Sequence, residues 1–383
     1  MTITNKIGLY LHIPFCLRKC RYCDFLSFAC ADENILSEYT EALIREIKIK
    51  STEWPYKIAD SIYIGGGTPS LLSEKNIARI MGSLYDNFNV DRNSEITIEC
   101  NPATASEEKL RAFRETGINR ISIGIQSWDN SVLRLMGRAH DKNDAFTAVR
   151  SAKKAGFKNI NLDLMFGIPG QTMKMWRDSI RQCIFLRPQH ISLYSLQLEE
   201  GTQFYKMVYE DHILSEPSEL VDRKMYHDAL IMLEDAGYNQ YEISNAALPG
   251  FESKHNLKYW SYEEYMGLGL GASSFIGGVR YKNCSNMIDY LNHIKEGKSP
   301  VNPEDIEKYT KREEMGIYTF TALRKKEGLD LGEFEDIFGR EFFKVYDPTV
   351  INTYFGYLDY EDNRLKLTDK GRDISNRIMA EFV

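Results

Sequence analysis

The sequence lacks any segment that would place it in or beyond a membrane. No run of about 18 apolar residues occurs in its 383 residues. Its first residues, MTITNKIGLYLHIPFC, lack the apolar core and cleavage site of a secretory signal. Hydrophobic residues make up 43% and charged residues 27%, as in ordinary globular proteins. We therefore expect a cytoplasmic protein, long enough for one large and one small domain or for two or three average domains.

Excess positive charge is also absent. The net charge is −7, from 48 lysines and arginines against 55 aspartates and glutamates. A broad nucleic-acid surface needs clustered positive charge, so we expect no nucleic-acid partner.

A disulfide framework is not expected either, because seven cysteines is an odd number and the chain is predicted to be cytoplasmic. Cys30, Cys183 and Cys284 are interpreted as ordinary thiols. The other notable cysteines fall close together, within residues 16–23. Reduced thiols in such a group fit a metal or a cluster.

Short β-rich segments alternate with helical patterns along the first half of the chain. Each segment precedes a stretch whose apolar residues have helical spacing, as in residues 37–50 and 107–115. This rhythm predicts βαβ units and a parallel sheet. Six units are fewer than the (βα)8 arrangement of a closed barrel, so we predict an incomplete (βα)6 barrel, with an open doubly wound sheet as the alternative. The six segments are residues 7–13, 61–65, 95–99, 120–125, 159–165 and 190–196.

Unusual residues follow these expected strands. GGGTP occupies residues 65–69, ECNP residues 99–102, and GIPG residues 167–170, while Gln126 follows the fourth strand and Asp163 lies within the fifth. In parallel α/β folds the carboxyl ends of the strands form the active-site face. We therefore expect these residues to line one mouth.

The strand–helix rhythm fades after about residue 205. We divide the chain into a partial barrel at residues 1–215, an extension of the barrel at 216–300, and a small terminal domain at 301–383. From about residue 303 a new pattern begins, with a helix near residues 311–322, the segments 328–338 and 364–369, and a terminal helix, which predicts a helical or winged-helix-like unit.

A three-cysteine loop follows the first strand. HIPFCLRKCRYCDF, at residues 12–25, spaces Cys16, Cys20 and Cys23 as C-x3-C-x2-C. Three thiolates can hold three corners of a [4Fe–4S] cube and leave its fourth iron open. The second alternative is a zinc site, with His12 or Cys30 as a further ligand. Closed zinc sites, however, usually use paired C-x2-C units. Three incidental thiols are the remaining alternative.

With Tyr22 before the last cysteine and the glycines at 65–67, the sequence resembles the radical S-adenosylmethionine (SAM) superfamily. The resemblance implies that the open iron chelates the amino and carboxylate groups of SAM. Reduction of the cluster would then cleave SAM to a 5′-deoxyadenosyl radical. Glycine suits the position beside the methionine amino group because it has no Cβ to block close approach.

The resemblance is closer to one group, which holds oxygen-independent coproporphyrinogen III oxidases and related haem chaperones. LYLHIPFC, GGGTPS, ECNP, RISIGIQS, DLMFGIPGQT and SLYSLQLEEGT carry it between residues 9 and 202, and residues 313–329 resemble the group's terminal domain. Tyr22 would lie beside the cluster. The SAM contacts that this resemblance implies are Tyr10, Gly66, Gly67, Thr68, Glu99, Gln126, Arg138 and Asp163.

Three features favour the haem-chaperone branch. Phe25 stands where the oxidases carry a fourth cysteine, the first strand begins at about residue 7 without their longer N-terminal extension, and residues 255–260 match the chaperones' H-N-x-x-Y-W motif. Imidazole is a common axial ligand of haem iron, and aromatic rings pack on porphyrin faces. Haem is thus expected near His255, and the motif leaves open whether His255 is the ligand of the haem iron. Without the resemblance, this segment would be interpreted as a loop that plugs a domain interface.

The resemblance implies a chaperone that binds haem, a [4Fe–4S] cluster and SAM and delivers haem to acceptors such as respiratory haemoproteins. The resemblance alone also implies peripheral association with the inner face of the membrane and the formation of a homodimer. The alternative is the oxidase reaction, decarboxylation of coproporphyrinogen III to protoporphyrinogen IX, which Phe25 and the motif argue against. A third hypothesis is a regulatory protein that keeps the fold and the cluster but has no catalytic activity. The motifs leave open whether SAM is turned over.

Overall fold

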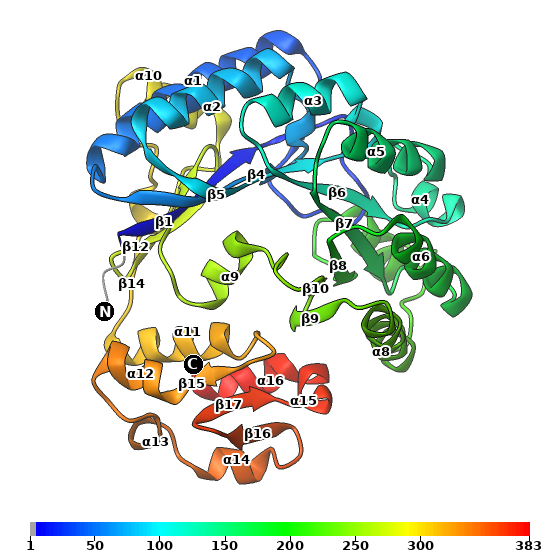
Figure 1. The fold of residues 1–383 in the computed structure, drawn as a ribbon, viewed down its shortest axis with the longest axis vertical. Helices are drawn as coiled ribbons and strands as arrows, with labels where there is room; N and C mark the ends of the chain where they lie inside the picture. Colours follow the sequence, from blue (N-terminus) through cyan, green and yellow to red (C-terminus); the bar gives the residue numbers. More distant parts are fainter. Residues whose placement is uncertain (1–4) are drawn as a thin grey trace.

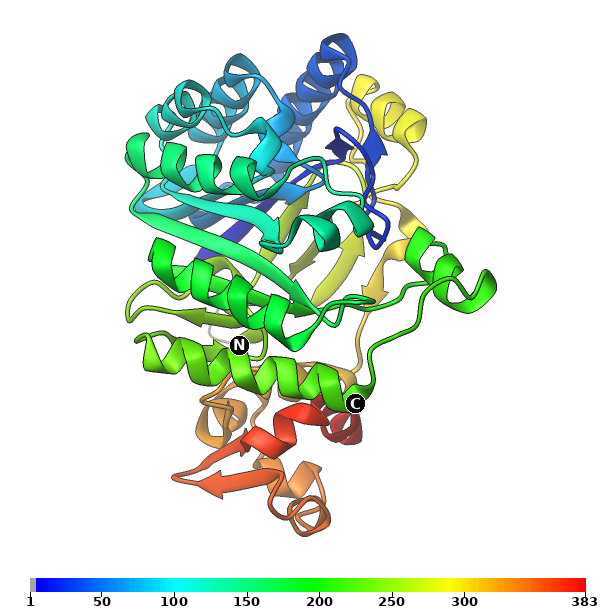
Figure 2. The same cartoon turned by 90° about the vertical axis from the view of Figure 1, so that its right-hand side faces the viewer.

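Six parallel strands form the centre of the protein in its computed structural model, which describes residues 5–383 (Figures 1 and 2). They neighbour one another in chain order, as βαβ units predict. Their apolar side chains are nearly all buried, which explains the strong sequence signal. The predicted partial barrel is confirmed. The strands are β1 (Lys6–Ile13), β4 (Ile58–Gly66), β5 (Asn89–Cys100), β6 (Arg120–Gln126), β7 (Asn159–Phe166) and β8 (His190–Ser195).

Helices cover the outer face of the curved sheet (Figure 1). Most begin at a Ser, Thr or Asp whose side chain accepts a hydrogen bond from the first turn, such as Asp141 before α5. Their apolar faces complete the main hydrophobic core. They are α1 (Glu33–Glu53), α2 (Glu74–Asn87), α3 (Glu107–Glu115), α4 (Asn130–Leu135), α5 (Lys142–Lys154), α6 (Met173–Leu186) and α8 (Glu219–Asp235).

The sheet continues beyond the six strands at both edges. β10 (Asn245–Ala247) and β9 (Asn239–Glu242) add to β8 as antiparallel strands. At the other edge, β11 (Tyr265–Leu268) pairs with β1 in parallel. The antiparallel strands β12 (Ser273–Ile276), β13 (Val279–Lys282) and β14 (Glu307–Lys308) follow it.

Strand β11 has no clear signal in the sequence. Four residues are too few to show a strand period, and the partner β1 is far away in the sequence. Gly267 within β11 is required by packing, since a Cβ there would lie 2.3 Å from the carbonyl oxygen of Ser273.

The H-N-x-x-Y-W segment is a helix, α9 (Lys254–Trp260), and not a loop. Ser253 caps it by accepting a hydrogen bond from the Asn256 N–H. Figure 1 shows α9 on the concave side of the sheet, between the strands and the C-terminal part of the chain. There it contacts β4 and α11 (Lys311–Ala322).

The C-terminal part has a hydrophobic core of its own, built from residues between Met315 and Phe382. After α11 come β15 (Leu329–Asp330) and α12 (Leu331–Phe338), and the hairpin of β16 (Leu358–Glu361) and β17 (Arg364–Leu367) completes a three-stranded sheet. This order of helix, strand, helix and hairpin is winged-helix-like, as predicted. The orange and red colours mark it at one end of the molecule in both views. The domain boundaries at 215 and 300 stay predictions.

Several shorter strands and α-helices lie between these elements or follow them. They are β2 (Phe15–Cys16), β3 (Phe28–Ala29), α7 (Gln203–Tyr205), α10 (Met287–Lys295), α13 (Phe342–Val345), α14 (Thr349–Thr353), α15 (Asp369–Asp373) and α16 (Ser375–Met379). Within residues 5–383, no helix combines the length and the apolar character needed to cross a bilayer.

Candidate functional site

The three-cysteine loop lies at the carboxyl end of β1. Cys16 belongs to β2, which pairs with β3, and the Cys23 N–H donates to the Cys20 carbonyl oxygen at 3.3 Å. All three thiols are partly exposed and line one cavity of about 430 Å³. Burial raises the pKa of Cys23 to about 11 and raises the pKa of Cys16. The Cys16 and Cys23 thiols are therefore protonated at neutral pH until a metal displaces their protons.

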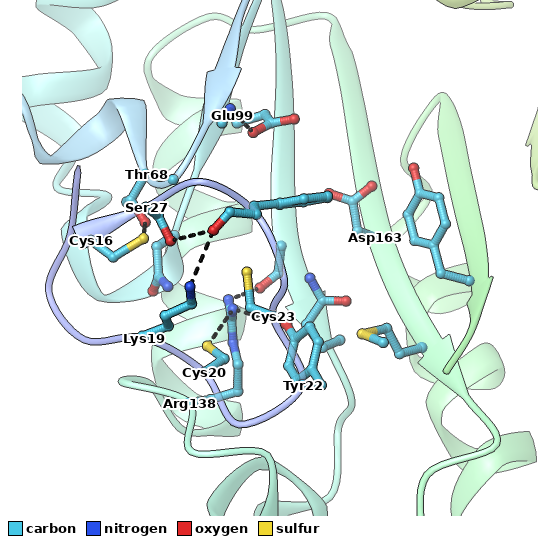
Figure 3. Close-up of a pocket in the computed structure, with 18 of the residues that line it drawn as sticks. Cys16, Lys19, Cys20, Tyr22, Cys23, Ser27, Thr68, Glu99, Arg138 and Asp163 are labelled. Atoms are coloured by element: carbon cyan, nitrogen blue, oxygen red, sulfur yellow. Dashed lines mark hydrogen bonds between the residues drawn. The ribbon is translucent and has the colours of Figure 1, made fainter. Parts of the chain in front are cut away.

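The cavity collects residues from the carboxyl ends of the strands, as the strand-end rule predicts. Figure 3 shows the cysteine loop on one side of it and Asp163, on β7, on the other. Of the expected cluster, SAM and haem contacts, all but Tyr10 and His255 line this cluster cavity, whereas residues 167–170, which were also expected at the mouth, do not. The contacts that line it are Cys16, Cys20, Tyr22, Cys23, Gly66, Gly67, Thr68, Glu99, Gln126, Arg138 and Asp163.

The glycine turn after β4 packs directly against the cysteine loop. A Cβ on Gly67 would lie 2.7 Å from the Phe15 carbonyl oxygen and 3.0 Å from Cys16 Sγ. Gly66 has a φ of +114°, which disfavours any residue with a side chain. Thr68 Oγ1 lies 3.5 Å from Cys16 Sγ and donates to it. Only glycine at position 67 leaves this cradle open beside the thiol.

Two half-buried carboxylates face the cavity. Glu99 accepts hydrogen bonds from Tyr63 Oη at 2.8 Å and from the Gly66 N–H at 3.1 Å. Burial raises its pKa to about 7, Asp163 acts in the same direction, and the two hydrogen bonds oppose them. Burial also raises the pKa of Asp163, which accepts from Ser122 Oγ at 2.9 Å. Two acidic groups in a low-dielectric cavity favour a cationic ligand.

Arg138 ties the cysteine loop to the barrel. Its Nη1 donates to Cys20 Sγ at 3.4 Å and to Tyr22 Oη at 3.3 Å, and its Nη2 donates to the Gly124 carbonyl oxygen at 2.6 Å. Nearby Gln126 has a φ of +67°, which is unusual for a residue with a side chain. Its buried Oε1 has no hydrogen-bond partner within residues 5–383. A bound ligand with a donor group would satisfy it.

Tyr10 lies behind this cavity and lines a second one of about 650 Å³. His12 Nε2 is 2.8 Å from the Leu26 carbonyl oxygen, which only accepts, so Nε2 carries the proton. Nδ1 is then the acceptor for the Tyr10 hydroxyl, 3.0 Å away. As a SAM contact, Tyr10 stays a prediction.

His255 lines neither cavity. It is 1% exposed, and its Nδ1 and Nε2 are hydrogen-bonded to Ser61 Oγ and Tyr259 Oη, each at 2.9 Å. Burial, with the charges of Lys258 and Arg120, lowers its pKa to about 3, so the imidazole is neutral. A role as haem ligand stays a prediction, and it would require one of these hydrogen bonds to break.

The cysteines do not converge on one point. No three His, Cys, Asp or Glu side chains within the described residues come close enough to hold a single metal ion. A cube-shaped cluster takes each thiolate at a separate corner and does not need such convergence. The glycine cradle, the unpaired Gln126 oxygen and the half-buried carboxylates fit a cluster with SAM beside it.

The sequence did not single out the side chains that hold the carboxylates. Tyr63, Ser122 and Asn161 lie inside apolar strands and donate hydrogen bonds to Glu99 or Asp163. Their signal was available, because a polar residue within an otherwise apolar parallel strand needs a partner in the interior. What the pattern could not show is which carboxylate each one meets.

Comparisons with known proteins identify the family of the chain. The sequence model of the radical SAM superfamily matches residues 10–183. "Heme chaperone HemW" of Lactococcus lactis is 38% identical over 375 residues, covering 98% of this chain and 96% of the relative. "Heme chaperone HemW" of Bacillus subtilis is 36% identical over 377 residues, covering 98% of both chains. The chain belongs to the HemW family of radical SAM proteins.

The fold has a counterpart among solved structures. Coproporphyrinogen III oxidase (HemN) from Escherichia coli, a radical SAM enzyme, superposes with a TM-score of 0.87 over 100% of this chain and 91% of that one. At 23% identity this likeness shows the fold alone. Membership of the radical SAM superfamily implies a [4Fe–4S] cluster and SAM as cofactors, and the three-cysteine cavity is where the chain offers ligands for them.

Proposed function

We propose that this protein is a haem chaperone, which binds haem and passes it to acceptor haemoproteins while holding a [4Fe–4S] cluster and SAM. The observation that carries the proposal is similarity over nearly the whole chain to proteins named "Heme chaperone HemW". Phe25 supports it, because this 61% exposed side chain lines the cluster cavity where the oxidases have a fourth cysteine. Helix α9, which carries the H-N-x-x-Y-W motif, supports it as well.

Each side of the cluster cavity has a distinct task in this proposal. Cys16, Cys20 and Cys23 would hold three irons, and the cluster supplies the electron that cleaves SAM when both are bound. The backbone of the glycine turn approaches the methionine end of SAM, since no Cβ stands in the way. Glu99 and Asp163 accept hydrogen bonds from its amino group or ribose hydroxyls.

Delivery to respiratory haemoproteins, peripheral location at the inner face of a membrane, and dimer formation belong to the same proposal. They rest on the family resemblance. The winged-helix-like end is the part of the chain most separate from the cluster cavity, with a core of its own, and it offers a surface for an acceptor that leaves the cavity free.

The test is a haem titration of anaerobically reconstituted protein, followed at the Soret band, beside His255→Ala and the exposed control His212→Ala. We expect saturation at roughly one haem per chain, followed by transfer to an added apo-haemoprotein. If the wild-type protein shows no saturable binding, the chaperone function is wrong. If His255→Ala alone weakens binding, haem lies on or beside α9, and if both variants bind normally, haem lies elsewhere.

Oxidative decarboxylation of coproporphyrinogen III is the second candidate, because the motifs between residues 9 and 202 resemble a group that includes the oxidases. Reduced, SAM-loaded protein would be incubated with coproporphyrinogen III, and protoporphyrinogen IX would be measured. We expect none. Product formed in many turnovers, in step with SAM cleavage, would establish the oxidase and reject the chaperone as the main function.

A further inference from the structure

The second cavity, called here the aromatic cavity, lies between the barrel edge and the C-terminal part of the chain. Helix α9, strands β11 to β13 and helix α11 all contribute to its wall. Its volume of about 650 Å³ suits a large organic ligand. Eight of its seventeen lining residues are Phe, Tyr or Trp, among them Tyr259, Trp260, Tyr262, Tyr265, Phe275 and Phe320.

Ring-on-ring packing holds this wall in place. Tyr259 meets Tyr265 edge to face, with ring centroids 4.6 Å apart, and Tyr262 meets Phe275 at 4.6 Å. The Arg324 guanidinium lies 4.4 Å from the Trp260 ring centroid and supports that ring by a cation–π contact. Flat, rigid aromatic faces of this kind match a flat, apolar macrocycle.

The same wall offers donors for negative charge. Trp260 Nε1 and Tyr262 Oη are buried and have no hydrogen-bond partner within the described part of the chain. Arg280 on β13 adds a guanidinium to the lining. Unpartnered donors and a cation beside an apolar slot suit a ligand that carries carboxylates at one edge.

We propose that the aromatic cavity is the haem site, with the macrocycle between the aromatic walls and the propionates on Arg280, Trp260 and Tyr262. The proposal rests on the haem-chaperone function and adds the place where haem is held. It also gives the two ends of the H-N-x-x-Y-W motif different tasks. Tyr259 and Trp260 line the cavity, whereas His255 stands behind them as a positioning residue.

The contacts of His255 support its assignment as a positioning residue. Its Nε2 is hydrogen-bonded to Tyr259 Oη and its Nδ1 to Ser61 on β4. The Tyr63 ring stacks on the imidazole with centroids 5.3 Å apart. The imidazole therefore anchors the cavity-lining ring of Tyr259 to the barrel without reaching the cavity itself.

The test blocks the cavity from two elements. Thr321 on α11 and Ser273 on β12 both line it, so Thr321→Trp and Ser273→Trp would place an indole inside. Thr353→Trp is the matched control, because Thr353 is exposed and, like Thr321, donates its hydroxyl to the carbonyl four residues earlier. Arg280→Gln tests the propionate contact, with the exposed Arg150→Gln as its control.

Haem affinity would be measured by Soret titration of reconstituted protein. Folding is checked by circular dichroism and by the SAM-induced change in the cluster's electron paramagnetic resonance spectrum. We expect both blocking variants to bind haem at least about tenfold more weakly, Arg280→Gln several-fold more weakly, and both controls to match the wild type.

The outcomes separate this inference from the function beneath it. If wild-type protein binds no haem, the chaperone function itself fails. If wild-type protein binds haem and a folded Thr321→Trp or Ser273→Trp variant binds it equally well, haem is held elsewhere and only the aromatic cavity is rejected. Should one blocking variant misfold, the other decides.

Discussion

The phenol ring of Tyr10 lies against that of Tyr63, with ring centroids 6.3 Å apart and planes inclined by 27°. Tyr63 lines the cluster cavity and Tyr10 lines the aromatic cavity, so the two rings form part of the wall between them. Tyr63 also donates its hydroxyl hydrogen to Glu99. Through its contacts with Glu99 and Tyr10, Tyr63 thus connects the proposed SAM site to the proposed haem site.

Removing that hydroxyl should weaken SAM binding. In Tyr63→Phe the ring stays, but Glu99 keeps only the Gly66 N–H of its two donors. Because the Tyr63 hydrogen bond lowers the pKa of Glu99, its loss should raise that pKa further and leave less carboxylate at pH 7. We expect SAM affinity to fall by about tenfold, as for loss of a hydrogen bond to a charged group. Calorimetric titration of reconstituted protein would measure it.

The control for this variant is Tyr56→Phe, which removes a hydroxyl from a side chain that is 84% exposed. It should bind SAM like the wild type. Equal SAM affinity in Tyr63→Phe and Tyr56→Phe would show that Glu99 does not need Tyr63 to bind SAM.

Most of the barrel and of its cluster cavity could be predicted from the sequence. The six parallel strands carry buried apolar residues at alternate positions, such as Ile121, Ile123 and Ile125 of β6, so their composition reveals them without any knowledge of their partners. The position of Gly66, Glu99 and Asp163 at or near strand ends then places them in one mouth, because parallel strands end on the same side.

The remainder depends on contacts that a local pattern does not contain. β11 is four residues long, and its parallel partner β1 lies at the other end of the barrel sequence. Tyr10 and Tyr63 both point into the barrel, yet their rings end in different cavities. The motif at 255–260 suggests that His255 is a haem ligand. In the helix, however, His255 faces inward and is hydrogen-bonded to Ser61, whereas Tyr259 and Trp260 line the aromatic cavity.

Cluster loading should depend on the loop cysteines and on no other cysteine tested. Cys20→Ser removes one of the three expected iron ligands and also the sulfur that Arg138 contacts. We expect bound iron to fall from about four atoms per chain to near zero, with loss of the reduced-cluster signal. Cys284→Ser, a partly exposed thiol outside the cavity, is the control. Full iron content in Cys20→Ser would contradict the assignment.

The stability of the cluster-free protein should carry a signature of Glu99 between pH 4.5 and 7. Its pKa is about 7 in the folded protein against 4.5 for an unperturbed glutamate. The folded state therefore binds more protons than the unfolded state in this range, and stability falls as the pH rises. The full effect is about 3 kcal/mol, and Glu99→Gln should remove it.

Urea unfolding of wild type and Glu99→Gln at several pH values would measure this difference. The variant should gain stability relative to the wild type as the pH rises from 4.5 to 7, and the difference should level off above pH 7. Parallel pH profiles for the two proteins would mean that Glu99 titrates normally when folded. Glu38→Gln, exposed on α1, controls for the loss of one carboxylate.

Glu46 should be a main source of stability at the β11 edge of the barrel. This fully buried carboxylate on α1 accepts hydrogen bonds from the Gly269 N–H, Tyr290 Oη and Asn283 Nδ2, each at 2.7 Å. It thereby ties the first helix to the segment after β11. Glu46→Ala would leave three buried donors without this acceptor, at a cost on the order of 3 kcal/mol. Glu46→Gln keeps one oxygen and should cost less.

Chemical denaturation of the cluster-free variants would measure these costs. Glu38→Ala lies on the solvent-exposed side of the same helix and should change the free energy of unfolding by less than about 0.5 kcal/mol. Because β11 also lines the aromatic cavity, Glu46→Ala should weaken haem binding together with stability, whereas the cluster cavity on the far side of β1 should still load iron. If Glu46→Ala were as stable as Glu38→Ala, the buried carboxylate would not hold the β11 edge in place.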